Sequence, residues 1–156
     1  MFDIQTKVLK RDVFEYLLDL EIKRAMRYQY FFSLLIIEPD LQVDVHNEAD
    51  IIKAIAEIIS DEVRATDTIG RMGKNNFYVM LPHSETSCTI TVAERIRNRV
   101  ESYTFSKSNG VTKKTISIGA ACFPTHSNEL KNLVNNATEM MNKAKETGGN
   151  RVCLPY

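Results

Sequence analysis

The chain has 156 residues, of which 44% are hydrophobic and 26% are charged, the composition of an ordinary soluble globular domain. Twenty basic and twenty acidic residues cancel, which argues against binding to nucleic acids or anionic membranes through bulk charge. The three cysteines are scattered and form no Cys-x-x-Cys pair, which is typical of free thiols in a reducing compartment. No stretch approaches the ~20 apolar residues of a membrane helix. We therefore expect one cytoplasmic domain over residues 1–156, with no nucleic-acid partner and no membrane insertion.

The first half of the chain predicts a helix, a buried strand and a second helix. Apolar residues between 12 and 27 recur at the spacing of an amphipathic helix. The apolar run 30–37 has the length of a buried strand, and Pro39 is expected to end its hydrogen-bond ladder. Residues 50–65 carry the clearest helical pattern, with isoleucines on one face and charges on the other.

The second half predicts a hairpin followed by alternating helices and strands. Strands at 68–72 and 77–81 flank residues 73–76, whose glycine and asparagines tolerate the positive φ of a tight connection. The remaining elements are a helix from 84 to about 102, a strand at 115–121, a helix at 128–147 and an edge strand at 151–154.

This order indicates an α/β protein of the α+β type. Six consecutive elements follow the βαββαβ arrangement, which is called ferredoxin-like. We expect a central, mostly antiparallel sheet flanked by helices. Such a fold carries many different functions, so the function has to be argued from particular residues.

Five segments, in order along nearly the whole chain, resemble the motifs of GGDEF domains, the catalytic domains of diguanylate cyclases. The predicted hairpin, 71–77 (RMGKNNF), stands where that family has R-x-G-G-D-E-F. The resemblance implies a GGDEF (nucleotidyl-cyclase-like) fold and a role in bacterial signal transduction through the second messenger cyclic di-GMP. The other segments are 3–14 (DIQTKVLKRDVF), 34–40 (LLIIEPD), 115–119 (TISIG) and 144–152 (AKETGGNRV).

Several positions depart from the catalytic pattern that the resemblance implies. Joining two GTP molecules is phosphoryl transfer assisted by magnesium, which prefers carboxylate oxygens. The family takes one carboxylate from the end of the first long strand, where Glu38 and Asp40 lie, and one from the hairpin. Asn75 places a neutral amide at that hairpin position, and Lys74 replaces a glycine that lets backbone N–H groups approach a phosphate.

The end of the chain and the segment after the first long strand also depart from the family. Lys145 is retained, whereas Gly149 replaces a phosphate-binding arginine, and residues 41–49 are shorter than the family's guanine-recognition segment. We therefore expect a degenerate domain that is not an enzyme, with no working metal site and no cofactor. The degenerate active-site positions are Glu38, Asp40, Gly73, Lys74, Asn75, Asn76 and Lys145, and the dispersed His46, His83 and His126 have no metal-ligand spacing.

Arg64 and Asp67 stand where family members carry the R-x-x-D inhibitory site for cyclic di-GMP, and Arg95 matches a third element of that site. An arginine fork can bind a phosphate or the O6/N7 edge of guanine, and an aspartate can accept hydrogen bonds from guanine. The simpler alternative is an exposed ion pair at i, i+3 spacing, worth a few tenths of a kcal/mol.

Three functions stay open at this point. The first is a catalytically inactive cyclic di-GMP receptor that uses the R-x-x-D site and signals to an unidentified protein partner. The second is a pseudoenzyme that binds no nucleotide and acts by dimerisation, as a homodimer, or by docking. The third is a weak GTP-binding enzyme or regulator that uses Glu38, Asp40, Lys74 and Lys145.

Overall fold

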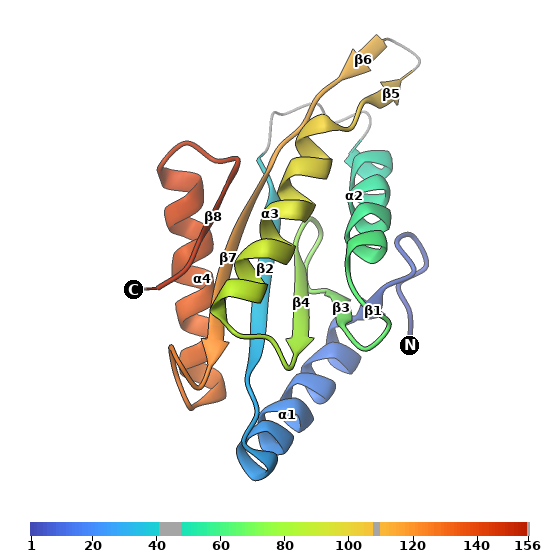
Figure 1. Cartoon of the computed structure of the whole chain (residues 1–156). Helices are drawn as coiled ribbons and strands as arrows, with labels where there is room; N and C mark the ends of the chain where they lie inside the picture. The colour runs from blue at the N-terminus through green and yellow to red at the C-terminus, as the bar shows by residue number, and fades with distance from the viewer. Residues whose placement is uncertain (41–47, 108–109, 156) are drawn as a thin grey trace.

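The computed structural model describes residues 1–40, 48–107 and 110–155. Its apolar segments form a six-stranded sheet with helices on both faces (Figure 1). The helices are α1 (Arg11–Tyr28), α2 (Glu48–Glu62), α3 (Thr86–Ser102) and α4 (Leu130–Glu146). The strands of the sheet are β1 (Leu9–Lys10), β2 (Phe32–Pro39), β3 (Thr68–Arg71), β4 (Phe77–Pro82), β7 (Ile116–Phe123) and β8 (Arg151–Cys153).

The order of the strands across the sheet is β1-β3-β4-β2-β7-β8. The four central strands pair antiparallel, whereas the edge strands β1 and β8 lie parallel to their neighbours. The βαββαβ arrangement predicted from the sequence is therefore confirmed. Both edge strands are short, which limits the unpaired backbone that the sheet exposes.

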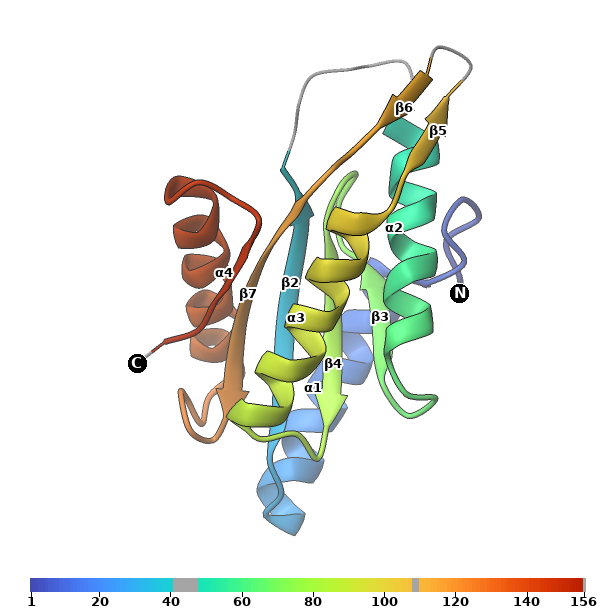
Figure 2. The ribbon, with the colours of Figure 1, turned by 45° about the horizontal axis from the view of Figure 1, so that its top comes forward.

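The sheet separates two apolar cores, each covered by two helices (Figures 1 and 2). Leu35 and Ile37 of β2 pack on the side of α2 and α3, and Leu34 and Ile36 pack on the side of α1 and α4. These four side chains are buried, which explains why β2 is an unbroken apolar run. Burial on both faces fixes the register of β2 and so the position of the polar residues that follow it.

Helix α4 approaches β7 very closely at Gly119. A Cβ atom added there would lie 2.1 Å from the backbone nitrogen of Met141 and 2.3 Å from the carbonyl oxygen of Ala137. Any side chain at this position would therefore displace helix backbone, so the glycine of the TISIG segment serves close packing.

The structure corrects several predicted boundaries. Helix α2 ends at Glu62 and not at residue 65, because the side chain of Asp67 accepts a 2.7 Å hydrogen bond from the Arg64 N–H and closes a turn. Pro39 is the last residue of β2, since a strand end tolerates the missing donor.

Three short strands were not predicted. They are β1 in the sheet and the two strands of a separate hairpin, β5 (Phe105–Lys107) and β6 (Gly110–Thr112), which extends beyond the sheet (Figure 2). Each is only two or three residues long, too short for a pattern of alternating apolar residues to be recognised. Within the described ranges, no helix has the length and apolar content needed to cross a membrane.

Candidate functional site

The predicted site residues gather at two ends of β3. The connection 73–76 follows this strand, and Ile37 of β2 pairs with Phe77 beside it, which brings Glu38 to the same end. We call this end the hairpin edge. Arg64 and Asp67 precede β3 and lie at its opposite end.

At that opposite end, the structure brings the three predicted cyclic di-GMP residues into one cavity of about 470 Å³. Arg64 and Asp67 come from the α2–β3 turn, and Arg95 comes from α3. We call this cavity the arginine pocket, and it is lined by Glu62, Arg64, Asp67, His83, Ser84, Ser87, Cys88, Thr91, Val92 and Arg95.

Arg64 and Asp67 differ strongly in exposure. The side chain of Asp67 is 2% exposed, whereas that of Arg64 is 59% exposed. An Arg64 Nη2 atom lies 3.4 Å from Asp67 Oδ1 and donates to the carbonyl oxygen of Pro82 at 2.9 Å and to Ser84 Oγ at 3.3 Å. Arg64 is therefore anchored on one side and open to solvent on the other, which an isolated surface ion pair would not provide.

Arg95 reaches the pocket already paired with a carboxylate. Its Nε atom lies 2.5 Å from Glu62 Oε2, and one Nη atom donates to the Glu62 carbonyl oxygen at 2.6 Å. Arg99 also contacts the Glu62 side chain, at 3.1 Å. Glu62 was not predicted as a site residue. One signal was present in the sequence: Glu62 ends a helix that has no basic residue in its last turn. Because the C-terminal end of a helix favours a nearby positive charge, such a helix end indicates a cation from another element.

At the hairpin edge, Arg71 ties the chain's N-terminal segment to the signature connection. It donates to Asp3 Oδ2 at 3.1 Å and Gln5 Oε1 at 2.7 Å, and twice to the carbonyl oxygen of Lys74. Burial alone would raise the pKa of the Asp3 carboxyl, but hydrogen bonds from Thr6 and Arg71 outweigh it and lower that pKa. The DIQT and RMGKNNF segments thus form one rigid unit.

A carboxylate from α2 lies beside the signature connection. Asn75 Nδ2 donates to Glu48 Oε1 at 2.5 Å, and Lys74 Nζ lies 3.6 Å from Glu48 Oε2. In the described part of the chain, the side-chain oxygens of Asn75 and Asn76 are buried without a hydrogen-bond partner. Sequence reasoning missed Glu48, which borders the shortened segment; residues 41–47 of that segment lie outside the described residues.

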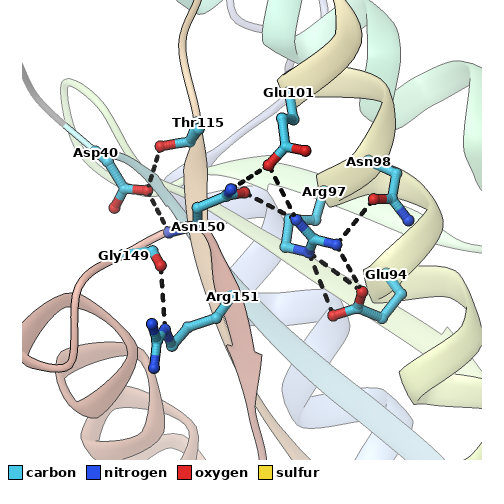
Figure 3. Close-up of polar contacts among 9 residues, drawn as sticks. All are labelled: Asp40, Glu94, Arg97, Asn98, Glu101, Thr115, Gly149, Asn150 and Arg151. Carbon is cyan, nitrogen blue, oxygen red and sulfur yellow. Dashed lines mark hydrogen bonds and ion pairs between the residues drawn. The ribbon is translucent and has the colours of Figure 1, made fainter.

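Asp40 has a different role from the one expected of it. It accepts hydrogen bonds from Thr115 Oγ1 and from the Asn150 backbone N–H, both at 2.7 Å (Figure 3). It also accepts one from Ser117 Oγ at 2.5 Å. Both carboxylate oxygens are engaged, so Asp40 joins β2, β7 and the turn before β8. Asp40 is therefore a structural residue and does not form a carboxylate pair with Glu38.

Glu38 forms an ion pair with Lys145, with 2.9 Å between Oε1 and Nζ. Across the described residues, no group of three or more His, Cys, Asp or Glu side chains could hold a metal ion. Glu38 is already paired with Lys145, and Asn75 is a neutral amide, so the residues present do not supply the two carboxylates that the family resemblance implies for magnesium. The absence of a metal cofactor stays a prediction.

A second cavity, of about 620 Å³, lies beside Asp40. Gly149 has φ +71°, and a Cβ atom there would lie 2.8 Å from Asp40 Cγ, so the arginine that the family has at this position would require the Asp40 carboxylate to shift. Three lysines give the cavity positive charge in place of that arginine. We call it the lysine pocket, and its lining residues are Asp40, Lys113, Lys114, Thr115, Lys145, Gly148 and Gly149.

The histidines do not form a metal site among the described residues. His83 is exposed and stacks on Tyr30, with 4.1 Å between ring centroids. His126 accepts a hydrogen bond from the Cys122 N–H, and burial lowers its pKa. His46 lies outside the described residues.

Residues 1–151 match the family model described as "Diguanylate cyclase, GGDEF domain". The chain belongs to the GGDEF family. It is 34% identical over 159 aligned residues to diguanylate cyclase DosC from Escherichia coli strain K12. That match covers 97% of this chain and 34% of DosC, so the chain spans about a third of the relative's length.

Solved GGDEF domains share the fold closely. The GGDEF domain of DgcB from Caulobacter crescentus, in complex with c-di-GMP, superposes with a TM-score of 0.89 at 23% identity, covering 98% of this chain and 92% of that one. The GGDEF domain of PA1120 from Pseudomonas aeruginosa superposes with a TM-score of 0.92 at 23% identity, covering 100% and 95%. The predicted GGDEF fold is confirmed.

The prediction that the chain is not an enzyme is wrong on these comparisons. It rested on departures at Lys74, Asn75 and Gly149 and on the shortened segment 41–49. The family match nevertheless runs from residue 1 to 151, and a relative that aligns with almost the whole chain is named a diguanylate cyclase. Departures at these positions do not remove the domain from a family of enzymes.

Proposed function

We propose that this GGDEF domain binds cyclic di-GMP in the arginine pocket through Arg64, Asp67 and Arg95. The observation that carries the proposal is the convergence of these three side chains from two elements into one cavity. The ligand-bound DgcB domain, which has the same fold, supports the choice of ligand. In this role the domain would act as a signalling module that reports the second messenger to a partner protein.

The roles of the two R-x-x-D residues follow from their exposure. Arg64 presents a guanidinium to solvent, where its planar fork can bind a phosphate or the O6/N7 edge of guanine. Asp67 is buried and holds the Arg64 backbone and side chain. We infer that Asp67 mainly orients Arg64, so that little side-chain entropy is lost when the ligand binds.

Replacing Arg64 with alanine should weaken cyclic di-GMP binding about thirtyfold or more, because a hydrogen-bonded charge is worth roughly 2 kcal/mol. Isothermal titration calorimetry on the nucleotide-stripped domain measures this directly. Arg64→Lys keeps the charge but loses the fork and should recover only part of the affinity.

The matched control is Arg24→Ala, which removes an exposed arginine on α1 and should leave the affinity unchanged. Melting curves confirm that each variant is folded. Equal affinity of the folded Arg64→Ala and wild-type proteins, or no binding by the wild type, would contradict the proposal.

A second function is favoured by the lysine pocket. We propose that this pocket binds the triphosphate of GTP, the substrate of the diguanylate cyclase reaction carried out by the family. Lys113, Lys114 and Lys145 surround a cavity of about 620 Å³, and Gly148 and Gly149 leave room at its rim. Lys145 is the lysine of the family motif that this chain retains, and here the other two lysines add charge.

Lys145→Ala should weaken GTP binding about tenfold and lower any formation of cyclic di-GMP by a similar factor, since one phosphate contact is lost. Lys131→Ala, at the exposed start of the same helix, is the matched control. Titration with GTP and magnesium, with product analysed by chromatography, tests both effects. If the two variants behave alike, the lysine pocket is not the GTP site.

A further inference from the structure

Glu62 is the meeting point of two arginines at the end of α2. Its side-chain oxygens contact Arg95 at 2.5 Å and Arg99 at 3.1 Å, and the side chain is only 15% exposed. The two arginines are four residues apart on α3 and therefore project from one face of that helix. The Glu62 carboxylate is thus shared by the two arginines beside the arginine pocket.

The surface around these arginines is larger than the arginine pocket alone. A third cavity, of about 650 Å³, adjoins the arginine pocket and is more open to solvent. Its lining includes Thr91, Arg95, Arg99 and Tyr103. Thr91 and Arg95 line both cavities, so the two cavities adjoin along α3, and we call them together the α3 groove. Arg95 stands at the middle of this groove, and Glu62 is bound to it from the side of α2.

We propose that Glu62 is an internal anion that competes with the phosphates of cyclic di-GMP for Arg95 and Arg99. Binding is then an exchange, in which a phosphate replaces the Glu62 carboxylate on the arginines. This inference rests on the proposed function, because it concerns how the same site admits its ligand. It also adds Arg99 to the residues that bind the ligand.

The chemistry of the ligand fits such an exchange. Cyclic di-GMP carries two phosphodiester groups, and each offers oxygens that match the planar fork of an arginine as a carboxylate does. A ligand that contacts Arg64, Arg95 and Arg99 together gains three charge-assisted contacts for the two Glu62 ion pairs that it breaks. A small monoanion gains a single contact, which does not compensate for displacing Glu62. Competition from Glu62 should therefore make the site prefer the dinucleotide to smaller anions.

The substitution Glu62→Gln tests the charge of the Glu62 side chain separately from its shape. Glutamine has nearly the same shape, and the Glu62 carbonyl oxygen, which accepts from Arg95 at 2.6 Å, is kept, so Arg95 should stay near its position. The variant should bind cyclic di-GMP about three- to tenfold more tightly, as expected for removal of a partly buried competing charge.

The matched control is Asp61→Asn. Asp61 is the preceding residue and 66% exposed, and it contacts Arg99 at 3.6 Å. Its replacement removes the same charge without breaking the Glu62 contacts of either arginine, so the affinity should change by less than about twofold. Arg99→Ala, made in the Glu62→Gln protein, should reduce the affinity about fivefold because one phosphate contact is lost.

Calorimetry on the whole chain, with cyclic di-GMP as titrant, decides the matter. Equal or weaker binding by Glu62→Gln, or equal gains in Glu62→Gln and Asp61→Asn, would overturn the competition while leaving the proposed site intact. If neither the wild type nor Glu62→Gln binds cyclic di-GMP, the competition and the proposed function both fail. If Glu62→Gln lowers the melting temperature, Glu62→Met, which is also uncharged, repeats the measurement.

Discussion

Replacing Asp40 with alanine should lower the free energy of unfolding by about 3 kcal/mol or more, since hydrogen bonds to a charged acceptor are lost and their donors are left without a partner. The donors are Thr115 Oγ1, Ser117 Oγ and the Asn150 N–H. The carboxylate joins β2 to β7 and to the turn before β8, so its loss should also loosen β8. Urea unfolding followed by circular dichroism measures the change.

Glu38→Ala is the matched control for this prediction. Glu38 is 25% exposed and, among the described residues, forms one ion pair, with Lys145, so its loss should cost less than about 1 kcal/mol. The carboxylates of Asp40 and Glu38 look equivalent in the sequence, but they differ in the number of groups that they hold in place. A small effect of Asp40→Ala, comparable to that of Glu38→Ala, would show that Asp40 is not a structural anchor.

Substitution of Gly119 by valine should destabilise the domain by about 3 kcal/mol or more, the upper end of overpacking effects, or prevent folding. The added Cβ would meet the backbone of α4 at 2.1 and 2.3 Å, and a helix backbone cannot rotate away as a side chain does. Since α4 carries Lys145, displacement of the helix should also disturb the lysine pocket. Thermal unfolding and the yield of folded protein report the effect.

Gly73→Ala provides the contrast. A Cβ atom at Gly73 would lie 2.6 Å from Asn76 Oδ1, which is buried but ends a flexible side chain and has no hydrogen-bond partner in the described structure. That oxygen can move, so the cost should stay below about 1 kcal/mol. Similar losses in the two glycine variants would mean that the close approach of α4 to β7 does not limit stability.

The sequence correctly indicated the elements with strong apolar periodicity. Helices 12–27 and 84–102 and strand 30–37 appear within about two residues of their predicted bounds, because burial of one helix face or of both strand faces leaves a repeating pattern. The short strands β1, β5 and β6 were missed, since two or three residues carry no period. The end of α2 was misplaced because the Arg64 N–H donates to the Asp67 side chain, which closes a turn and stops the helix.

The candidate site was predicted in part. Arg64, Asp67 and Arg95 were identified by their resemblance to a family motif, and they do meet in one cavity. The partner of Arg95 was not identified, because Glu62 belongs to another helix and its contact depends on how α2 and α3 pack. For the same reason Glu48 beside Asn75 was not expected.

The prediction of a non-enzyme failed for a related reason. It rested on departures taken together at Lys74, Asn75, Gly149 and the shortened segment 41–49, whereas family membership is carried by the match over residues 1–151. The structure also shows that Gly149 and Asp40 are coupled, because the glycine leaves the space that the Asp40 carboxylate fills. A departure from a motif is therefore best interpreted together with its spatial neighbours.

The sequence by itself determined the fold class, the order of the main elements and the three residues of the arginine pocket. These depend on local periodicity and on motifs that are contiguous in the chain. Only the tertiary structure decided that Asp40 is an anchor, that Glu62 holds Arg95 and Arg99, and that three lysines surround one cavity. These contacts join side chains from different elements, and their geometry is set by the packing of helices against the sheet.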